Sequence, residues 1–160
     1  GRDWQLATIQ LDFQMPLKME AEYEGQDGKR HPAVMIHRAI LGSLERFIGV
    51  LTEHYAGKFP LWLSPVQVRI LTVADRFNDY AYQLRQKYLD AGIRVEVDDK
   101  AESVPYKVRE AELDKVNYIL VVGEKEVVAG TVTVRKGKEQ YTVDAGKFLQ
   151  QLLGEIEEKR

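Results

Sequence analysis

The chain opens with a regular alternation of hydrophobic and polar residues. Over residues 4–13, every second residue from Ala7 to Phe13 is apolar and the residues between them are polar. A period of two predicts a strand with one face on a hydrophobic core. The opposite face carries the uncharged polar groups of Thr8 and Gln10, followed by Asp12. It is either an ordinary solvated surface or part of a sheet whose earlier strands precede Gly1.

A second alternation covers residues 18–24, after Pro16 has ended the first strand. It predicts a half-exposed strand. Asp27 and Gly28 form a dipeptide that favours a tight hairpin turn, which returns the chain through residues 29–35. The first piece of the chain is therefore expected to be β-β-β followed by a helix.

The hydrophobic period changes after residue 35. Apolar residues recur in steps of three and four from Ile36 to Tyr55, and Gly57 follows them. This spacing predicts one amphipathic helix over residues 36–57. His37 and Arg46 lie nine positions apart, which places them on opposite sides of that helix and about 13 Å apart along its axis. We do not expect the two side chains to bind one small chemical group together.

Pro60 and Pro65 interrupt the pattern, and we place a domain boundary near Ser64, giving domains 1–63 and 64–160. Strand and helix patterns alternate beyond it, which predicts an α/β domain with a mixed sheet that is parallel in its first three strands. The expected strands are 66–73, 93–98, 118–123 and 129–137, and the expected helices are 75–92, 103–116 and 144–159.

Composition narrows the possibilities. No run of about 18 apolar residues could span a bilayer and no secretory signal opens the chain, so we expect a cytoplasmic protein with no membrane partner. A net charge of −2 gives no general basic excess, so any nucleic-acid contact must be local. The chain has no cysteine, so a metal would need histidine, carboxylate or an outside ligand.

Four residues stand out as candidates for chemistry, and each has a plainer structural interpretation. His37 is a metal ligand or a structural histidine. Arg46 binds a phosphate or pairs with a carboxylate. Glu126 and Arg135 flank a glycine-separated turn, where they either read unstacked bases or form a solvated ion pair. No phosphate-binding glycine loop, serine triad or paired-histidine motif occurs.

Four stretches carry a family resemblance: GRDWQLATIQLDF, AVMIHR, AILGSLERFIGVLTE and FPLWLSPVQV. Together they resemble the C-terminal part of bacterial-type threonyl-tRNA synthetases, over essentially the whole chain. The resemblance implies that the first third is the end of a class II catalytic core, a small remnant of its antiparallel sheet that includes the third signature motif. The remainder then resembles the anticodon-binding domain shared with the prolyl, histidyl and glycyl enzymes.

The same resemblance implies roles for individual residues. His37 matches a ligand of the catalytic zinc, which holds threonine and rejects valine, a discrimination that an apolar pocket makes poorly. Arg46 matches the catalytic arginine that contacts the phosphates of ATP. Other matches in the adenylate and threonine pockets are Gln5, Thr8, Gln10 and Ser43. Matches placed near the anticodon bases are Arg109, Lys115, Glu126 and Arg135.

The family's other zinc ligands, a cysteine and a second histidine, would lie before Gly1, as would motifs 1 and 2 and most of the dimer interface. We therefore expect the 160 residues alone to be inactive in joining threonine to tRNA(Thr) with ATP, and to hold neither Zn²⁺ nor ATP/Mg²⁺ stably. The parent enzyme is expected to be a homodimer. The alternative is a free-standing RNA-binding or regulatory module without catalysis. The joint presence of Thr8, Gln10, His37 and Arg46 favours the enzyme.

Overall fold

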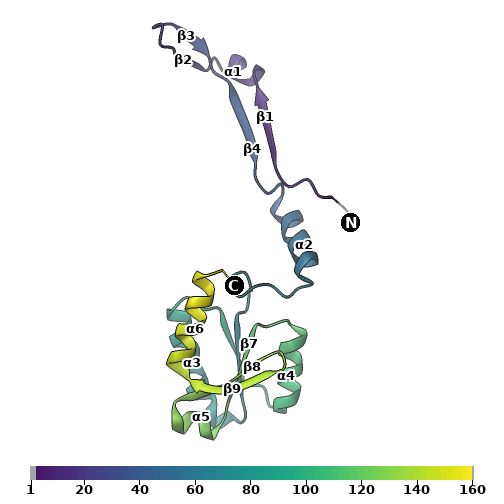
Figure 1. The fold of residues 1–160 in the computed structure, drawn as a ribbon, viewed down its shortest axis with the longest axis vertical. Helices are drawn as coiled ribbons and strands as arrows, with labels where there is room; N and C mark the ends of the chain where they lie inside the picture. Colours follow the sequence, from purple (N-terminus) through teal and green to yellow (C-terminus); the bar gives the residue numbers. More distant parts are fainter. Residues whose placement is uncertain (1–2, 160) are drawn as a thin grey trace. The chain divides into compact units, whose positions relative to one another are not determined.

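The computed structural model describes residues 3–159. The chain divides into two compact units, Gly1–His54 and Tyr55–Arg160, which are described separately below (Figure 1). The domain boundary expected near Ser64 stays a prediction. Among the described residues, no helix has the length and apolarity needed to cross a membrane.

The N-terminal unit contains two separate antiparallel strand pairs. One pair joins β1 to β4 and the other joins β2 to β3. The hairpin turn predicted at Asp27 and Gly28 is confirmed, and Gly28 has the positive φ of +69° that such a turn needs. The elements of this unit are β1 Thr8–Asp12, α1 Gln14–Lys18, β2 Glu22–Glu24, β3 Arg30–Pro32, β4 Met35–Ala39 and α2 Leu44–Tyr55.

The short helix α1 is an element that the alternation did not predict. Asp12 starts it, because its Oδ1 accepts hydrogen bonds from the backbone N–H groups of Gln14, at 2.8 Å, and Met15, at 2.9 Å. Pro16 lies inside the first turn of this helix, where the missing N–H costs nothing. The first piece thus has four strands and two helices in place of the expected β-β-β-α.

The prediction of one helix over residues 36–57 is wrong. Residues Met35–Ala39 form β4, whose backbone groups pair with β1, and α2 begins only at Leu44. Between them Gly42 takes a φ of +67°, and the Ser43 Oγ accepts a hydrogen bond from the Arg46 backbone N–H at 3.2 Å. The helical spacing of Ile36 and Ile40 is a coincidence, because the backbone N–H and C=O groups of β4 form their hydrogen bonds with β1.

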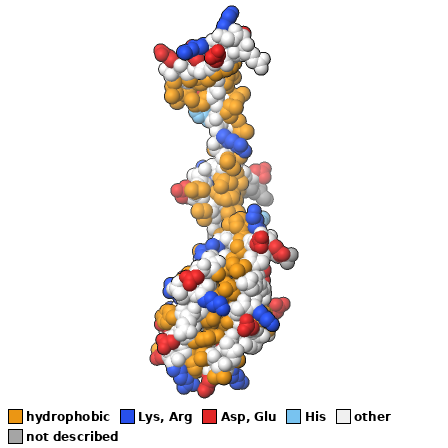
Figure 2. Space-filling view, turned by 90° about the vertical axis from the view of Figure 1, so that its left-hand side faces the viewer, with side chains coloured by type: hydrophobic (Ala, Val, Ile, Leu, Met, Phe, Trp, Pro, Cys, Tyr) orange, Lys and Arg blue, Asp and Glu red, His pale blue; other side chains and the backbone are white. Residues whose placement is uncertain are grey.

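Large apolar side chains of this unit lie at its surface. Ile9, Leu11 and Ile36 are each more than 60% exposed, and Figure 2 shows hydrophobic side chains over the outside of the unit. A two-stranded ribbon has too little area to bury both of its faces. This unit therefore gains little stability from a core of its own.

The C-terminal unit is an α/β domain built on one five-stranded sheet of order β6-β5-β7-β8-β9. The prediction that its first three strands are parallel is confirmed, and β8 and β9 run antiparallel. Its elements are β5 Val68–Thr72, η1 Asp75–Phe77, α3 Asn78–Asp90, β6 Val95–Asp98, α4 Val104–Leu113, β7 Tyr118–Val122, α5 Glu124–Ala129, β8 Thr131–Lys136, β9 Glu139–Asp144 and α6 Ala145–Glu157. The sequence patterns missed α5 and β9.

Helices cover the two faces of this sheet unequally. The larger core lies between the sheet and helices α3 and α6, which are seen in Figure 1. It buries Tyr88, Leu120 and Phe148 completely. Helix α4 covers part of the opposite face through a smaller cluster that includes Leu71 and Val108. Because strand residues alternate between faces, β7 supplies both cores. On β8 and β9, the sheet face on the same side as α4 carries polar side chains.

Candidate nucleic-acid interface

Strand β8 presents a polar row on the face that it shares with α4. Val132 and Val134 point into the larger core and are fully buried, so Thr133 and Arg135 lie on the other face. Thr142 of β9 is paired with Thr133, and their hydroxyl oxygens lie 3.1 Å apart. This row runs along the sheet beside α4 and ends at Arg135.

Arg135 lines a cavity of about 480 Å³ at the end of that row. Ile119, its neighbour across the β7–β8 ladder, forms part of the wall. The charged side chains that line the cavity are four cations against one carboxylate: Lys58, Lys115, Lys138 and Arg135, with Glu112. A local positive site therefore exists on a chain of net negative charge, as the sequence required of any nucleic-acid contact.

Lys115 reaches this cavity from an unusual backbone conformation. It follows the end of α4 with a φ of +60°, where its N–H donates to the Glu112 carbonyl at 3.2 Å. Glycine is the usual residue at such a left-handed helix end, and a side chain there costs about 1 kcal/mol. The position thus keeps a lysine despite a conformational penalty.

Glu126 lies on α5, where the sequence had suggested a turn. Its Oε2 accepts a hydrogen bond from the Gly123 N–H at 3.0 Å, and its Oε1 accepts one from the Thr133 hydroxyl at 2.7 Å. Among residues 3–159, the ion pairs do not include one between Glu126 and Arg135. Glu126 therefore caps α5 and fixes Thr133 in the polar row. Whether it also contacts a base stays a prediction.

The structure brings two of the four predicted anticodon residues into one cavity. Lys115 and Arg135 both line it, although 20 positions of sequence separate them. Arg109 is exposed on α4, and neither it nor Glu126 lines the cavity. Patterns in the sequence missed Lys58 and Lys138. No local signal marks Lys58, because only the folded chain brings it beside Arg135. Lys138 lies three positions after Arg135, so that proximity in the sequence could have indicated it.

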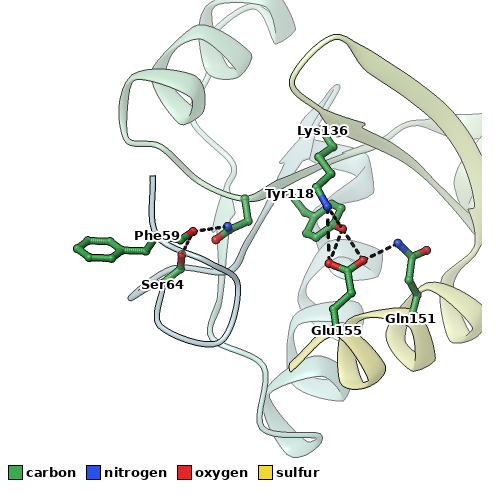
Figure 3. A network of polar contacts seen from close by, with 7 residues as sticks. Phe59, Ser64, Tyr118, Lys136, Gln151 and Glu155 are labelled. Carbon is green, nitrogen blue, oxygen red and sulfur yellow. Dashed lines mark hydrogen bonds and ion pairs between the residues drawn. The ribbon is translucent and has the colours of Figure 1, made fainter. Parts of the chain in front are cut away.

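Buried polar contacts hold the segment that carries Lys58. The Asn117 side-chain amide donates to the Phe59 carbonyl at 2.9 Å, and the Ser64 hydroxyl donates to the same oxygen at 3.2 Å (Figure 3). Gln67, which is 1% exposed, donates to the Leu61 carbonyl at 2.8 Å. Residues 58–67 are thereby tied to the start of β7.

A second network in Figure 3 lies on the neighbouring strands. The Tyr118 hydroxyl donates to Glu155 of α6, and Lys136 Nζ donates to the Tyr118 oxygen at 2.6 Å. Burial raises the pKa of Tyr118 well above its ordinary value, and the hydrogen bond to Glu155 raises it further. Tyr118 is therefore a neutral donor at any physiological pH, and the network joins β7, β8 and α6.

The predicted catalytic-core residues lie in the N-terminal unit. Gln10 of β1 is paired with His37 of β4, and Thr8 is paired with Ala39, so Thr8, Gln10 and His37 share one face of the strand pair. Ser43 caps α2, and Arg46 is exposed in its first turn. Gln5 is exposed ahead of β1.

His37 has a carboxylate neighbour that the sequence did not suggest. Its Nε2 lies 3.0 Å from Oδ2 of Asp12. Hydrogen bonds from the Met15 backbone, from His37 and from the Gln14 backbone lower the pKa of Asp12. Within residues 3–159, no group of three histidine, cysteine, aspartate or glutamate side chains could hold a metal ion. One imidazole and one carboxylate do not match the three or four protein ligands that zinc takes.

Comparison with known proteins agrees with this division of the chain. A family model described as an anticodon binding domain matches residues 67–155, more than half of the chain. The chain belongs to this anticodon-binding family. A second model, the class II tRNA synthetase core domain of the G, H, P, S and T enzymes, matches residues 1–55. The resemblance to synthetases is therefore confirmed in both parts of this family member.

Individual relatives point to threonine. The threonine–tRNA ligase of Carboxydothermus hydrogenoformans is 52% identical over all of this chain and 26% of its own length. That of Clostridioides difficile is 53% identical over 99% of this chain and 25% of its length. A solved structure, the RNA binding domain of threonyl-tRNA synthetase from Cryptosporidium parvum Iowa II, covers 96% of this chain and 40% of its own, with a TM-score of 0.86 and 35% identity. The chain spans about a quarter of the length of the two threonine–tRNA ligases.

Proposed function

We propose that this chain is the C-terminal part of a threonine–tRNA ligase and that its main task is recognition of the anticodon of tRNA(Thr). The whole enzyme would activate threonine with ATP and transfer it to the tRNA. The relatives named above carry this activity in their names, and the chain is about half identical to them over its full length. The alternative of a free-standing RNA-binding module has no separate support.

The observation that carries this proposal is the meeting of Lys115 and Arg135 in one cationic cavity, inside the part of the chain that matches an anticodon-binding domain. Single-stranded bases present edges that arginine can bind with two hydrogen bonds, and nearby cations attract the backbone phosphates. The polar row of β8 leads to the cavity, and we expect the RNA to follow this row. Arg109 and Glu126 would contact the loop outside the cavity.

Titration of the 160-residue chain with a fluorescent anticodon stem-loop of tRNA(Thr) tests the proposal. We expect Arg135→Ala to weaken binding about 10-fold, the value of one good bidentate base contact. Arg85→Ala is the matched control, because Arg85 lies on α3 and α3 packs on the opposite face of the sheet. A stem-loop with altered anticodon bases should bind the unaltered chain less tightly. Equal affinity of Arg135→Ala and the unaltered chain would remove the anticodon assignment.

For the catalytic core we propose contributory roles only. His37 would supply one metal ligand, Arg46 would contact ATP phosphates, and Thr8, Gln10 and Ser43 would face the adenylate, in a site completed by residues outside this chain. Gln5 would lie beside the same pocket. The described residues do not fit a zinc ion by themselves, so no step of the reaction is assigned to a metal here.

The remaining proposals follow from the same assignment. Threonine, ATP with Mg²⁺ and tRNA(Thr) would be the substrates of the whole enzyme, which would act as a homodimer in the cytoplasm. The 160 residues alone would not charge tRNA. An aminoacylation assay with threonine, ATP and tRNA(Thr) checks this, and turnover by the isolated chain would contradict it.

A further inference from the structure

We infer that the segment just before the anticodon-binding match forms one wall of the RNA site, and that Lys58, together with Lys115 and Lys138, binds a backbone phosphate of one unstacked nucleotide in the Arg135 cavity. This inference rests on the proposed function and adds residues and a ligand subsite to it. Lys58 lies outside both family matches, which cover residues 1–55 and 67–155.

Three separate parts of the chain supply the cations. Lys58 comes from the segment after α2, Lys115 from the α4–β7 loop, Arg135 from β8 and Lys138 from the β8–β9 turn. None of the ion pairs among residues 3–159 uses any of these four side chains. Their charges are therefore available to an anion. Glu112 is the single acidic residue in the lining.

The cavity has the size and the lining to bind a base in addition to a phosphate. Its volume of about 480 Å³ lies within the ordinary range of small-molecule sites, which is roughly 300–1,000 Å³. Ile119 and Val116 supply an apolar surface beside the cations. Proteins bind single-stranded nucleic acid through positive charge beside aromatic side chains on which bases stack, and Phe59 is the aromatic residue in the cavity lining.

The backbone at Lys115 carries a conformational cost, as it does at Glu20 and Ala56, which also follow helices. A glycine at its φ of +60° would remove the conformational cost, so the lysine destabilises the helix end that it follows. The Lys58 segment is fixed beside it, because Asn117 holds the Phe59 carbonyl and a Cβ on Gly57 would lie 3.7 Å from the Lys115 side chain. The backbone segments that carry both lysines thus lie side by side before any ligand arrives.

The arrangement assigns different tasks to the cations. Arg135 extends from the polar row of β8, where bases would lie, into the cavity. The three lysines surround it at the ends of loops. We therefore assign sequence discrimination to Arg135 and phosphate neutralisation, which is blind to sequence, to Lys58, Lys115 and Lys138.

Binding of the anticodon stem-loop at several salt concentrations tests this division. Lys58→Ala and Lys138→Ala should each weaken binding about three- to tenfold, equally for the cognate loop and for one with altered anticodon bases. Each should lower the slope of log affinity against log salt by up to about 0.7, the value for one whole phosphate contact to a single strand, because the three lysines share one phosphate. Lys87→Ala on α3 is the matched control and should change neither quantity.

Lys115→Gly separates binding from folding. It should weaken RNA binding to the same extent while leaving the urea midpoint unchanged or higher, because it relieves the left-handed backbone. The source of the phosphate is tested with a free mononucleotide. A mononucleotide that binds as tightly as the stem-loop, with Lys58→Ala weakening only the mononucleotide, would overturn the inference in favour of an independent small-ligand site.

The outcomes distinguish the inference from the proposed function. Loss of binding in Arg135→Ala with unchanged affinity and salt slope in Lys58→Ala and Lys138→Ala would overturn the inference and leave anticodon recognition standing. Failure of the unaltered chain to bind the stem-loop would remove the proposed function itself.

Discussion

The hydroxyl of Tyr118 donates a hydrogen bond to the carboxylate of Glu155, at 2.7 Å from Oε1 and 2.8 Å from Oε2. Tyr118 is 1% exposed on the central strand β7, and Glu155 lies near the end of α6, 37 residues later in the chain. Lys136 completes the contact from β8, at 3.6 Å from Glu155. This pair therefore ties the last helix to the sheet that carries the cationic cavity.

Tyr118→Phe should lower the free energy of unfolding by about 1–3 kcal/mol, because it removes a hydrogen bond between a buried hydroxyl and a charged group. Urea unfolding followed by the fluorescence of Trp62, in a Trp4→Phe background, measures this change in the C-terminal unit. Tyr82→Phe is the control, since Tyr82 also donates to a carboxylate, that of Asp99 at 2.7 Å, but is 45% exposed. An effect in Tyr82→Phe as large as that in Tyr118→Phe would contradict the reasoning.

The Glu155 contact should also make stability depend on pH. Burial raises the pKa of Glu155, but hydrogen bonds from Gln151 and Tyr118 and the charge of Lys136 together bring it below its ordinary value of 4.5. A lowered folded-state pKa means that the stabilisation is complete above 4.5 and is lost as the pH falls through the folded value. The difference in unfolding free energy between the unaltered chain and Glu155→Gln should therefore shrink on acidification. A difference that stays constant down to pH 3 speaks against it.

Lys107 is a buried cation held by backbone oxygens. It is 2% exposed, and its Nζ donates to the carbonyls of Thr72, at 3.0 Å, and Asp98, at 3.2 Å. Lys107→Ala should destabilise the C-terminal unit by about 3 kcal/mol, because it leaves a cavity and two carbonyls without their donor. Lys107→Met should cost less, since methionine refills most of the volume and removes a buried charge. Equal losses in the two variants, measured by urea unfolding, would show that the hydrogen bonds alone matter.

Two glycines should respond to alanine in opposite directions. Gly130 ends α5 with a φ of +66° and has open space around the Cβ position, so Gly130→Ala should destabilise by about 1 kcal/mol through backbone conformation alone. Gly154 lies within α6 and also has open space, so Gly154→Ala should stabilise by about 0.5–1 kcal/mol. Thermal unfolding of the two variants compares them directly. A destabilising Gly154→Ala would contradict the helix-propensity argument.

The regular elements of the C-terminal unit could be predicted because their signals are local. Strand β7 is a continuous apolar run, as a central strand buried on both faces must be, and β5 is apolar except for Arg69 and Thr72. Gly92, with a φ of +85°, ends the predicted helix before β6. Ser103 and Pro105 mark the start of α4 as expected, although the Ser103 side chain makes no capping hydrogen bond.

Other elements lacked such signals. Helix α5 has only six residues and no apolar stripe, and its start depends on the Glu126 carboxylate reaching back to Gly123. Strand β9 follows β8 after a short turn and alternates on a half-exposed edge. The error over residues 36–57 arose because Ile36 and Ile40 fit a helical spacing, while pairing with β1 decided the conformation.

The sequence by itself determined the fold class, the family and the candidate binding residues, because periodicity and short motifs are properties of neighbouring positions. It identified Arg135 and Lys115 as candidates for anticodon binding, and His37 and Arg46 as candidates for the catalytic core. Only the tertiary structure decided which of them meet. The cavity brings Lys58 and Lys115 beside the stretch that carries Arg135 and Lys138. No local pattern encodes that meeting, because it depends on the order in which the strands pair.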